Sequence, residues 1–221
     1  MGFAGFPATA FDFYARLELD NSRPFWLANK AIYDEAIKGT IANVSDAVER
    51  RFGELHLFRP YRDVRFSKDK TPYKTAAGAV TESEGGSAYY LQISAEGLFV
   101  GCGMYVMASD QLERWRSNLD DGRRGAAIAK SVADLRSARY EIGAMESLKT
   151  APRGYPKDHP RIDLLRMKGL TMGKTFPLAK WLHTPKALDR VVDVWDAAKP
   201  MNSWLERNVG PSTLAPPEPD F

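Results

Sequence analysis

The stretch AYYLQISAEGLFVGCGMYVM, residues 88–107, predicts an antiparallel β-hairpin and thereby decides the fold class of this 221-residue chain. Apolar and polar side chains alternate on both sides of Glu96-Gly97, which favours a turn at this pair with Ala95 opposite Leu98. In this register one face of the hairpin is apolar, and we expect it to pack on helices. Its members are Tyr89, Leu91, Ile93, Val100, Cys102 and Met104.

The other face of the hairpin places Tyr90 across from Gly103 and Gln92 across from Gly101, with Tyr105 beside them. Two glycines on one sheet face remove side chains where something must come close. Three interpretations remain open: a ligand, the ring of Tyr90 lying over Gly103, or a tightly packed helix.

Patterns outward from the hairpin predict helices, then a meander of strands, then helices again. Further strands are expected at residues 55–66 (interrupted at Pro60), 75–81, 139–143 and 168–176. Helices are expected at residues 10–19 (after a Thr9 cap), 22–51 (capped by Ser22 and broken near Gly39), 109–118, 125–137, 161–167, 185–199 and 201–207. We therefore expect an α+β fold: an antiparallel β-meander sheet of about five strands flanked by N-terminal and C-terminal helices.

Composition and motifs limit the function classes. We expect one domain, residues 1–208, and a disordered proline-rich tail, residues 209–221. No apolar run is long enough for a bilayer and no secretory signal is visible, so no membrane association is expected. The one cysteine, Cys102, indicates a reducing compartment, which predicts a cytoplasmic location, and its place on the apolar face favours a buried hydrophobe over a nucleophile.

Familiar cofactor and enzyme signatures are missing from the sequence. The three histidines lie far apart and form no metal-ligand spacing, so we expect neither a metal nor a cofactor. Nucleotide phosphate loops, Rossmann turns and nucleophile elbows have no match.

The segment RPYRDVRFSKDKTPYKT, residues 59–75, carries the most unusual charge pattern. Residues 59–74 hold six basic and two acidic side chains, a net +4, which leaves −1 for the rest of a chain whose total is +3. We interpret the segment as an interrupted strand followed by a stiff loop, in which Asp63 orients the neighbouring arginines toward an anion. Together with the polar hairpin face it supplies the candidate ligand-binding residues: Arg59, Arg62, Asp63, Arg65, Lys68, Lys70, Tyr73, Lys74, Tyr90, Gln92, Gly101, Gly103 and Tyr105.

Three functions fit this segment. The first is a small-molecule site, enzymatic or not, for a phosphorylated or carboxylated ligand. The second is nucleic-acid binding, with Tyr61, Phe66 and Tyr73 stacking on bases. The third is a scaffold or interaction module, in which the charges form a structural ion-pair network. We rank nucleic acid second because the rest of the chain is near neutral.

A second polar cluster, Lys157-Asp158-His159-Pro160-Arg161, offers candidate catalytic residues. A histidine beside an aspartate is suited to acid–base chemistry, so His159 and Asp158 are candidate proton carriers in what we expect to be an exposed loop. The alternative is that Asp158 or His159 begins the turn that Pro160 opens.

At this point the chain resembles a widespread bacterial domain of unknown function, also found in fungi. The resemblance rests on an arginine, an RD-x-RF run and a DK-x-x-Y element, here Arg59, Arg62-Asp63, Arg65-Phe66, Asp69-Lys70 and Tyr73. It extends over the chain to about residue 207. Two positions depart from the pattern: Asp20-Asn21-Ser22-Arg23 stands for NNxR, and Val106 for a proline. The resemblance implies a single-domain cytoplasmic protein and no particular activity.

Overall fold

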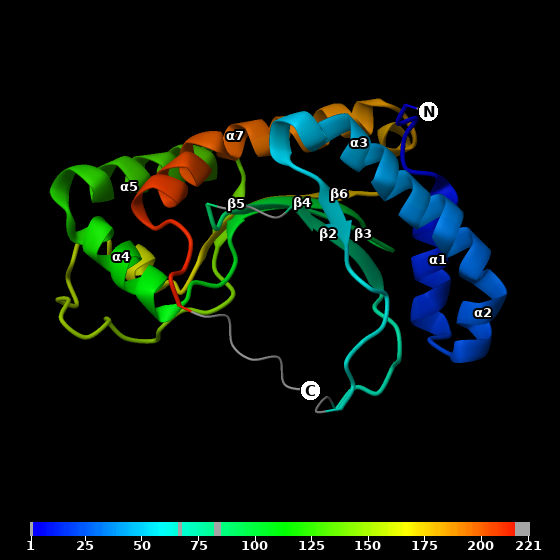
Figure 1. The fold of residues 1–221 in the computed structure, drawn as a ribbon, viewed down its shortest axis with the longest axis horizontal. Helices are drawn as coiled ribbons and strands as arrows, with labels where there is room; N and C mark the ends of the chain where they lie inside the picture. Colours follow the sequence, from blue (N-terminus) through cyan, green and yellow to red (C-terminus); the bar gives the residue numbers. More distant parts are fainter. Residues whose placement is uncertain (1, 66–67, 82–84, 215–221) are drawn as a thin grey trace. The chain divides into compact units, whose positions relative to one another are not determined.

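The computed structural model describes residues 2–65, 68–81 and 85–214 and combines helices with one open antiparallel sheet (Figure 1). The six strands of the sheet follow the order β1-β2-β3-β4-β6-β5. They are β1 (Leu55–Leu57), β2 (Ala76–Thr81), β3 (Ala88–Ser94), β4 (Gly97–Met104), β5 (Glu141–Gly143) and β6 (Leu170–Pro177). The α+β class is therefore confirmed, with six strands where about five are expected.

The contacts divide the chain into two compact units, each of which is described by itself. Unit 1 consists of Met1–Glu82, Tyr89–Gly101 and Lys174–Trp195. Unit 2 consists of Ser83–Ala88, Cys102–Gly173 and Asp196–Phe221.

Unit 1 opens with four successive helical segments, drawn in blue in Figure 1. They are α1 (Ala8–Leu19), α2 (Arg23–Ile32), the π-helix η1 (Tyr33–Gly39) and α3 (Thr40–Phe52). The Ser22 side chain accepts a hydrogen bond from the Phe25 N–H at 3.3 Å, so the predicted cap of α2 is confirmed. The predicted Thr9 cap is wrong, because α1 begins earlier and Pro7 stands before its first turn.

The hairpin has its faces as predicted, but its turn lies one residue earlier. Strand β3 ends at Ser94 and β4 begins at Gly97, so the turn consists of Ala95 and Glu96. Gly97 serves a different purpose: its φ is +132°, and a Cβ there would lie 2.2 Å from the Phe176 carbonyl oxygen of β6. The apolar face is buried; Leu91, Ile93 and Val100 are fully covered.

The long strand predicted at residues 55–66 is wrong beyond its first residues. Strand β1 ends at Leu57, and we call residues 58–75 the arm. Its first residue, Phe58, still donates its N–H to the Gly78 carbonyl of β2 at 2.9 Å, and beyond it the chain leaves the sheet before it returns as β2 (Figure 1). Of the arm, residues 66 and 67, which include the predicted base-stacking Phe66, lie outside the described residues.

The helices of unit 2 pack around the side chains of Trp115 and Trp204. Its helices are α4 (Ser109–Asp120), α5 (Gly122–Ser137), α6 (Ile162–Arg166) and the second half of α7 (Lys186–Asn208). Trp115 is fully buried, donates its indole N–H to the Leu164 carbonyl at 3.2 Å and meets Trp204 edge-on at 5.8 Å. This packing joins α4 to α6 and to the end of α7.

Helix α7 is one helix, and the predicted break between residues 199 and 201 is wrong. Pro200 lies inside the helix, where a proline costs about 3 kcal/mol. Burial of Ala198, Met201 and Leu205, all with 0% exposure, offsets that cost because the apolar stripe continues through the proline.

The segment after α7 rests on α4 as far as it is described. Arg114 donates to the carbonyl of Val209 and, at 2.7 Å, to that of Pro211, and Asp110 accepts from the Thr213 N–H at 2.8 Å. The rest of the predicted disordered tail, residues 215–221, lies outside the described residues. Among the helices of the described chain, none has the length and apolar character needed to cross a membrane.

Candidate functional site

The arm is a narrow two-stranded extension of unit 1. The Arg62 N–H donates to the Pro72 carbonyl at 2.9 Å, and the Lys74 N–H donates to the Pro60 carbonyl at 2.8 Å. Tyr61 and Tyr73 form the antiparallel bridge between these two bonds. Both prolines act only as acceptors, so they interrupt regular strand pairing without leaving an unpaired donor.

The returning side of the arm is attached to α2 and the turn before it. The Asn21 side chain donates to the Tyr73 carbonyl at 3.0 Å and accepts from the Tyr73 N–H at 3.1 Å. The Tyr73 ring stacks on Trp26 with 4.3 Å between centroids and 7° between planes. Since Tyr73 is only 4% exposed, its ring face is already occupied, and Tyr61, which is 50% exposed, is the more accessible tyrosine of the arm.

One ion pair links the two sides of the arm. Arg62 donates Nη1 to Asp69 and, at 2.9 Å, to the Thr71 hydroxyl. Asp69 in turn accepts from the Thr71 N–H at 2.9 Å and from its hydroxyl at 2.8 Å. Hydrogen bonds from Thr71, and then the Arg62 guanidinium, lower the pKa of the Asp69 carboxyl. Asp69 thus fixes one guanidinium nitrogen of Arg62, and within the described part of the chain Nε and Nη2 remain available.

Asp63 orients a neighbouring arginine, as the sequence suggests. Its carboxylate accepts from Arg65 at three donors: the backbone N–H at 3.1 Å, Nε at 3.1 Å and Nη2 at 2.8 Å. These bonds lower the pKa of the Asp63 carboxyl to about 2. Arg65 is therefore engaged by Asp63 rather than directed at a ligand.

The Asp63–Arg65 pair gives a first prediction. Because the folded pKa is lowered, the pair stabilises the arm above the ordinary carboxyl pKa of 3.8, and this contribution is lost as the pH falls toward 2. In a pH titration followed by NMR, the Arg65 amide resonance should move with a midpoint near 2. In an Arg65→Ala variant the Asp63 midpoint should rise toward 3.8. A wild-type midpoint near 4 would show that the pair is open in solution.

Two of the six candidate cations, Arg62 and Lys74, line a common pocket at the base of the arm. This arm-base pocket is an open hollow of about 410 Å³ that lies wholly in unit 1. It is lined by Phe58, Arg62, Lys74, Thr75, Ala76, Gly78, Tyr90 and Gln92. None of the described lining residues is acidic. The other cations lie elsewhere: Lys70 donates to the Val64 carbonyl at 2.8 Å, Arg65 pairs with Asp63, and Arg59 and Lys68 are exposed.

The floor of the arm-base pocket comes from the pairing of β2 with β3. Gly78 stands opposite Gln92, and a Cβ on Gly78 would lie 2.5 Å from the Tyr90 hydroxyl oxygen. The glycine therefore lets the tyrosine pack on the backbone of β2. The Tyr90 hydroxyl donates to Gln92 Oε1 at 2.8 Å, which leaves the Gln92 amide NH₂ as a donor.

The glycines expected to form this floor have other contacts. Gly103 has φ +122°, and a Cβ there would lie 2.2 Å from the Leu170 carbonyl oxygen of β6. The Gly101 carbonyl accepts the Trp195 indole N–H at 3.0 Å. Gly103 and the exposed Tyr105 belong to unit 2, and none of the three lines the arm-base pocket.

His159 is buried rather than exposed, with 8% of its surface accessible. Its Nδ1 accepts from the Arg161 N–H at 3.0 Å, which places the proton on Nε2, 3.2 Å from Asp120. Asp158 is exposed, so the carboxylate beside the imidazole is Asp120. These contacts favour the alternative reading of a turn-forming histidine, because they join the loop to the end of α4.

The sequence patterns missed four lining residues: Phe58, Thr75, Ala76 and Gly78. The alternation of Ala76, Gly78 and Val80 is visible in the sequence. Their partners depend on the β2–β3 register, for which no local signal exists.

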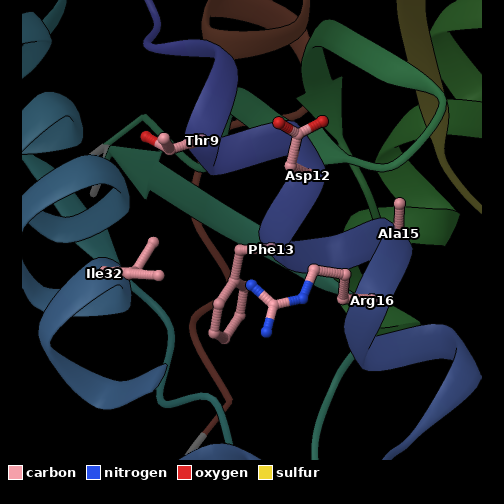
Figure 2. A pocket seen from close by; sticks show the side chains of 6 residues that line it. All are labelled: Thr9, Asp12, Phe13, Ala15, Arg16 and Ile32. Carbon is pink, nitrogen blue, oxygen red and sulfur yellow. The ribbon is translucent and has the colours of Figure 1, made fainter. Parts of the chain in front are cut away.

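Two other hollows of unit 1 fit an anion less well. One lies beside α1, has a volume of about 360 Å³ and includes Asp12, which adds a carboxylate to its wall. In Figure 2 the Arg16 side chain extends into it beside Phe13, and the guanidinium lies 5.3 Å from the Phe25 ring centroid. Another, of about 430 Å³, contains Asp189 beside Lys180 and Lys186. In the described ranges, no group of three or more histidine, cysteine or acidic side chains is arranged to hold a metal ion.

The fold and the pocket define an α+β protein with an arm that departs from an open antiparallel sheet. Residues 9–204 match the family described as "Conserved hypothetical protein (DUF2461)", and the chain belongs to that family. A search of curated proteins and a search of solved structures found no match. The expected membership in a family of unknown function is thus confirmed.

Proposed function

We propose that this protein binds a small phosphorylated or carboxylated molecule in the arm-base pocket. The observation that carries the proposal is the lining, in which Arg62 and Lys74 meet the Gln92 amide without a described carboxylate. Lys74 lies with Nζ 5.4 Å from the Phe58 ring centroid and forms no ion pair with a described residue. A charged donor without such a partner is suited to hold an anion, and Arg62, although paired with Asp69 through Nη1, adds a second positive charge.

The signature residues of the arm divide into two roles under this proposal. Asp63, Arg65 and Asp69 support the shape of the arm through their ion pairs, and Tyr73 anchors it on α2. Arg62 has both roles, because Nη1 fixes the arm while Nε and Nη2 are left for the ligand. The scaffold interpretation therefore describes how the site is built rather than a competing function.

The expected cytoplasmic location belongs to the same proposal. Cys102 is a buried free thiol whose pKa is raised to about 12 by burial, so it needs no disulfide partner and is poorly reactive. A cytoplasmic protein would meet phosphorylated metabolites, the kind of ligand proposed here. Nucleic-acid binding remains the second candidate and is weakened because the Tyr73 ring is already stacked on Trp26.

A thermal-shift screen of phosphorylated and carboxylated metabolites tests the proposal, followed by titration of each hit against two variants. Lys74→Gln removes a cation from the pocket, and Lys68→Gln removes an exposed cation from the same arm outside it. Losing a charge-assisted hydrogen bond should weaken binding about 10–100-fold in Lys74→Gln. Lys68→Gln should bind like the wild type.

Two results would contradict the proposal. One is a screen in which no metabolite raises the melting temperature. The other is a hit that Lys74→Gln and wild-type protein bind equally well. The nucleic-acid alternative would be favoured instead by a different set of results: no metabolite hit, retention of the protein on heparin, and an affinity for nucleic acid that falls steeply with salt and drops equally in both lysine variants.

A further inference from the structure

Aromatic rings form a row on the sheet face that floors the arm-base pocket. Phe58 and Tyr90 have centroids 6.4 Å apart, and Tyr90 and Phe99 have centroids 6.0 Å apart. All three belong to unit 1, and Phe58 is 44% exposed. The row reaches into the pocket, since both Phe58 and Tyr90 line it. Tyr90 and Phe99 are half-buried. A ring that is at least partly exposed offers a surface on which another ring can stack.

The pocket therefore has two chemically different parts. One part carries the cations Arg62 and Lys74, whereas the other carries the rings of Phe58, the first residue of the arm, and of Tyr90 beside the small residues Ala76 and Gly78. Because their side chains are small or missing, Ala76 and Gly78 leave space in the pocket beside the two rings.

Lys74 lies at the border between the two parts. Its Nζ is 5.4 Å from the Phe58 ring centroid, so an anion bound to Lys74 is within reach of a ring stacked at Phe58. The Gln92 amide, whose oxygen is held by Tyr90, offers its NH₂ group to a polar ring edge.

Resting on the proposed function, we infer that the ligand is a planar aromatic molecule that carries its own phosphate or carboxylate, with a nucleoside monophosphate as the type case. The ring stacks on Phe58 and Tyr90, and the acid group binds Lys74 and the free nitrogens of Arg62. The pocket volume of about 410 Å³ lies within the range of small-molecule sites, roughly 300–1,000 Å³. An aliphatic phosphate or acid would use the cations and leave the aromatic row uncovered.

Matched pairs of probes test the inference by calorimetric titration of the full chain. Adenosine and uridine 5′-monophosphates are compared with ribose 5-phosphate, and phenylacetate is compared with cyclohexylacetate. Within at least one pair, the aromatic member should bind about 10-fold or more tightly than its non-aromatic counterpart.

Two variants of one residue separate ring stacking from the hydroxyl group. Tyr90→Leu removes the ring and should abolish the preference for the aromatic member, while Tyr90→Phe keeps the ring and should retain the preference. Thermal melting verifies that each variant is folded. Lys74→Gln should weaken both members of a pair by similar factors, because it acts on the acid group.

The outcomes distinguish the inference from the proposed function. If both members of each pair bind equally and Lys74→Gln weakens them, the inference is wrong while the anion site stands. The inference is also wrong if Tyr90→Leu keeps the aromatic preference. If no probe binds the wild-type protein, the inference is wrong, and the metabolite screen alone decides whether the proposed function stands.

Discussion

Replacing Gly103 by valine is expected to destabilise the protein by more than about 4 kcal/mol, a large part of the 5–15 kcal/mol by which a domain is typically stable. Two causes act together. The φ of +122° at Gly103 strains any β-branched residue, and a Cβ would lie 2.2 Å from the Leu170 carbonyl oxygen. That oxygen is backbone of β6, so it can move only if the β4–β6 contact opens. Gly103→Ala should also lower the unfolding free energy, but by less than Gly103→Val.

Gly143 provides the matched control for this prediction. It lies in β5 of the same unit, its backbone has no positive φ, and a Cβ there would have no atom within 4 Å. Gly143→Ala should change the unfolding free energy by less than about 1 kcal/mol. Denaturant unfolding of the three variants gives the comparison. Wild-type stability in Gly103→Ala together with weaker ligand binding would restore Gly103 as part of a ligand floor.

The hairpin shows which parts of the fold the sequence predicts. Alternation with a period of two is a local property, so it identified the buried face of Leu91, Ile93 and Val100 correctly even though the turn was placed one residue late. The error arose at Gly97, which reads as a turn glycine in isolation. Its missing Cβ instead lets β6, which lies far along the chain, come close, since a Cβ would lie 2.2 Å from the Phe176 carbonyl oxygen.

The arm shows why the candidate site was only partly predictable. Charge and spacing identify the segment, but they do not distinguish a cation held by a neighbour from one left for a ligand. Arg65 is held by Asp63 two residues away, whereas Lys74 faces Phe58. The pocket also needs Gly78 and Gln92, which meet only in the β2–β3 register. That register is set by which face of the whole sheet is buried, and not by any local feature of Gly78 or Gln92.

Helix packing affects the site through a single tryptophan. Trp26 is 2% exposed and contacts Phe13, Tyr33 and Tyr73, with centroid separations of 5.8, 4.8 and 4.3 Å. Trp26→Ala should lower the unfolding free energy by about 3–5 kcal/mol, because it opens a cavity between α1 and α2. It should also free the Tyr73 side of the arm, so limited proteolysis within residues 58–75 should become several-fold faster.

The same variant should weaken ligand binding even though Trp26 does not line the arm-base pocket. Arg62 and Lys74 lie on the two sides of the arm, and their positions depend on how the arm is fixed at Tyr73. Asn21→Ala is the matched control, since it removes the hydrogen bonds to Tyr73 without opening the aromatic core. It should speed cleavage of the arm and weaken binding at a smaller cost in stability, about 1–3 kcal/mol. If both variants melt at lower temperature while arm cleavage and ligand affinity stay at wild-type values, the stack on Trp26 does not position the site, and the arm must be held by its own ion pairs.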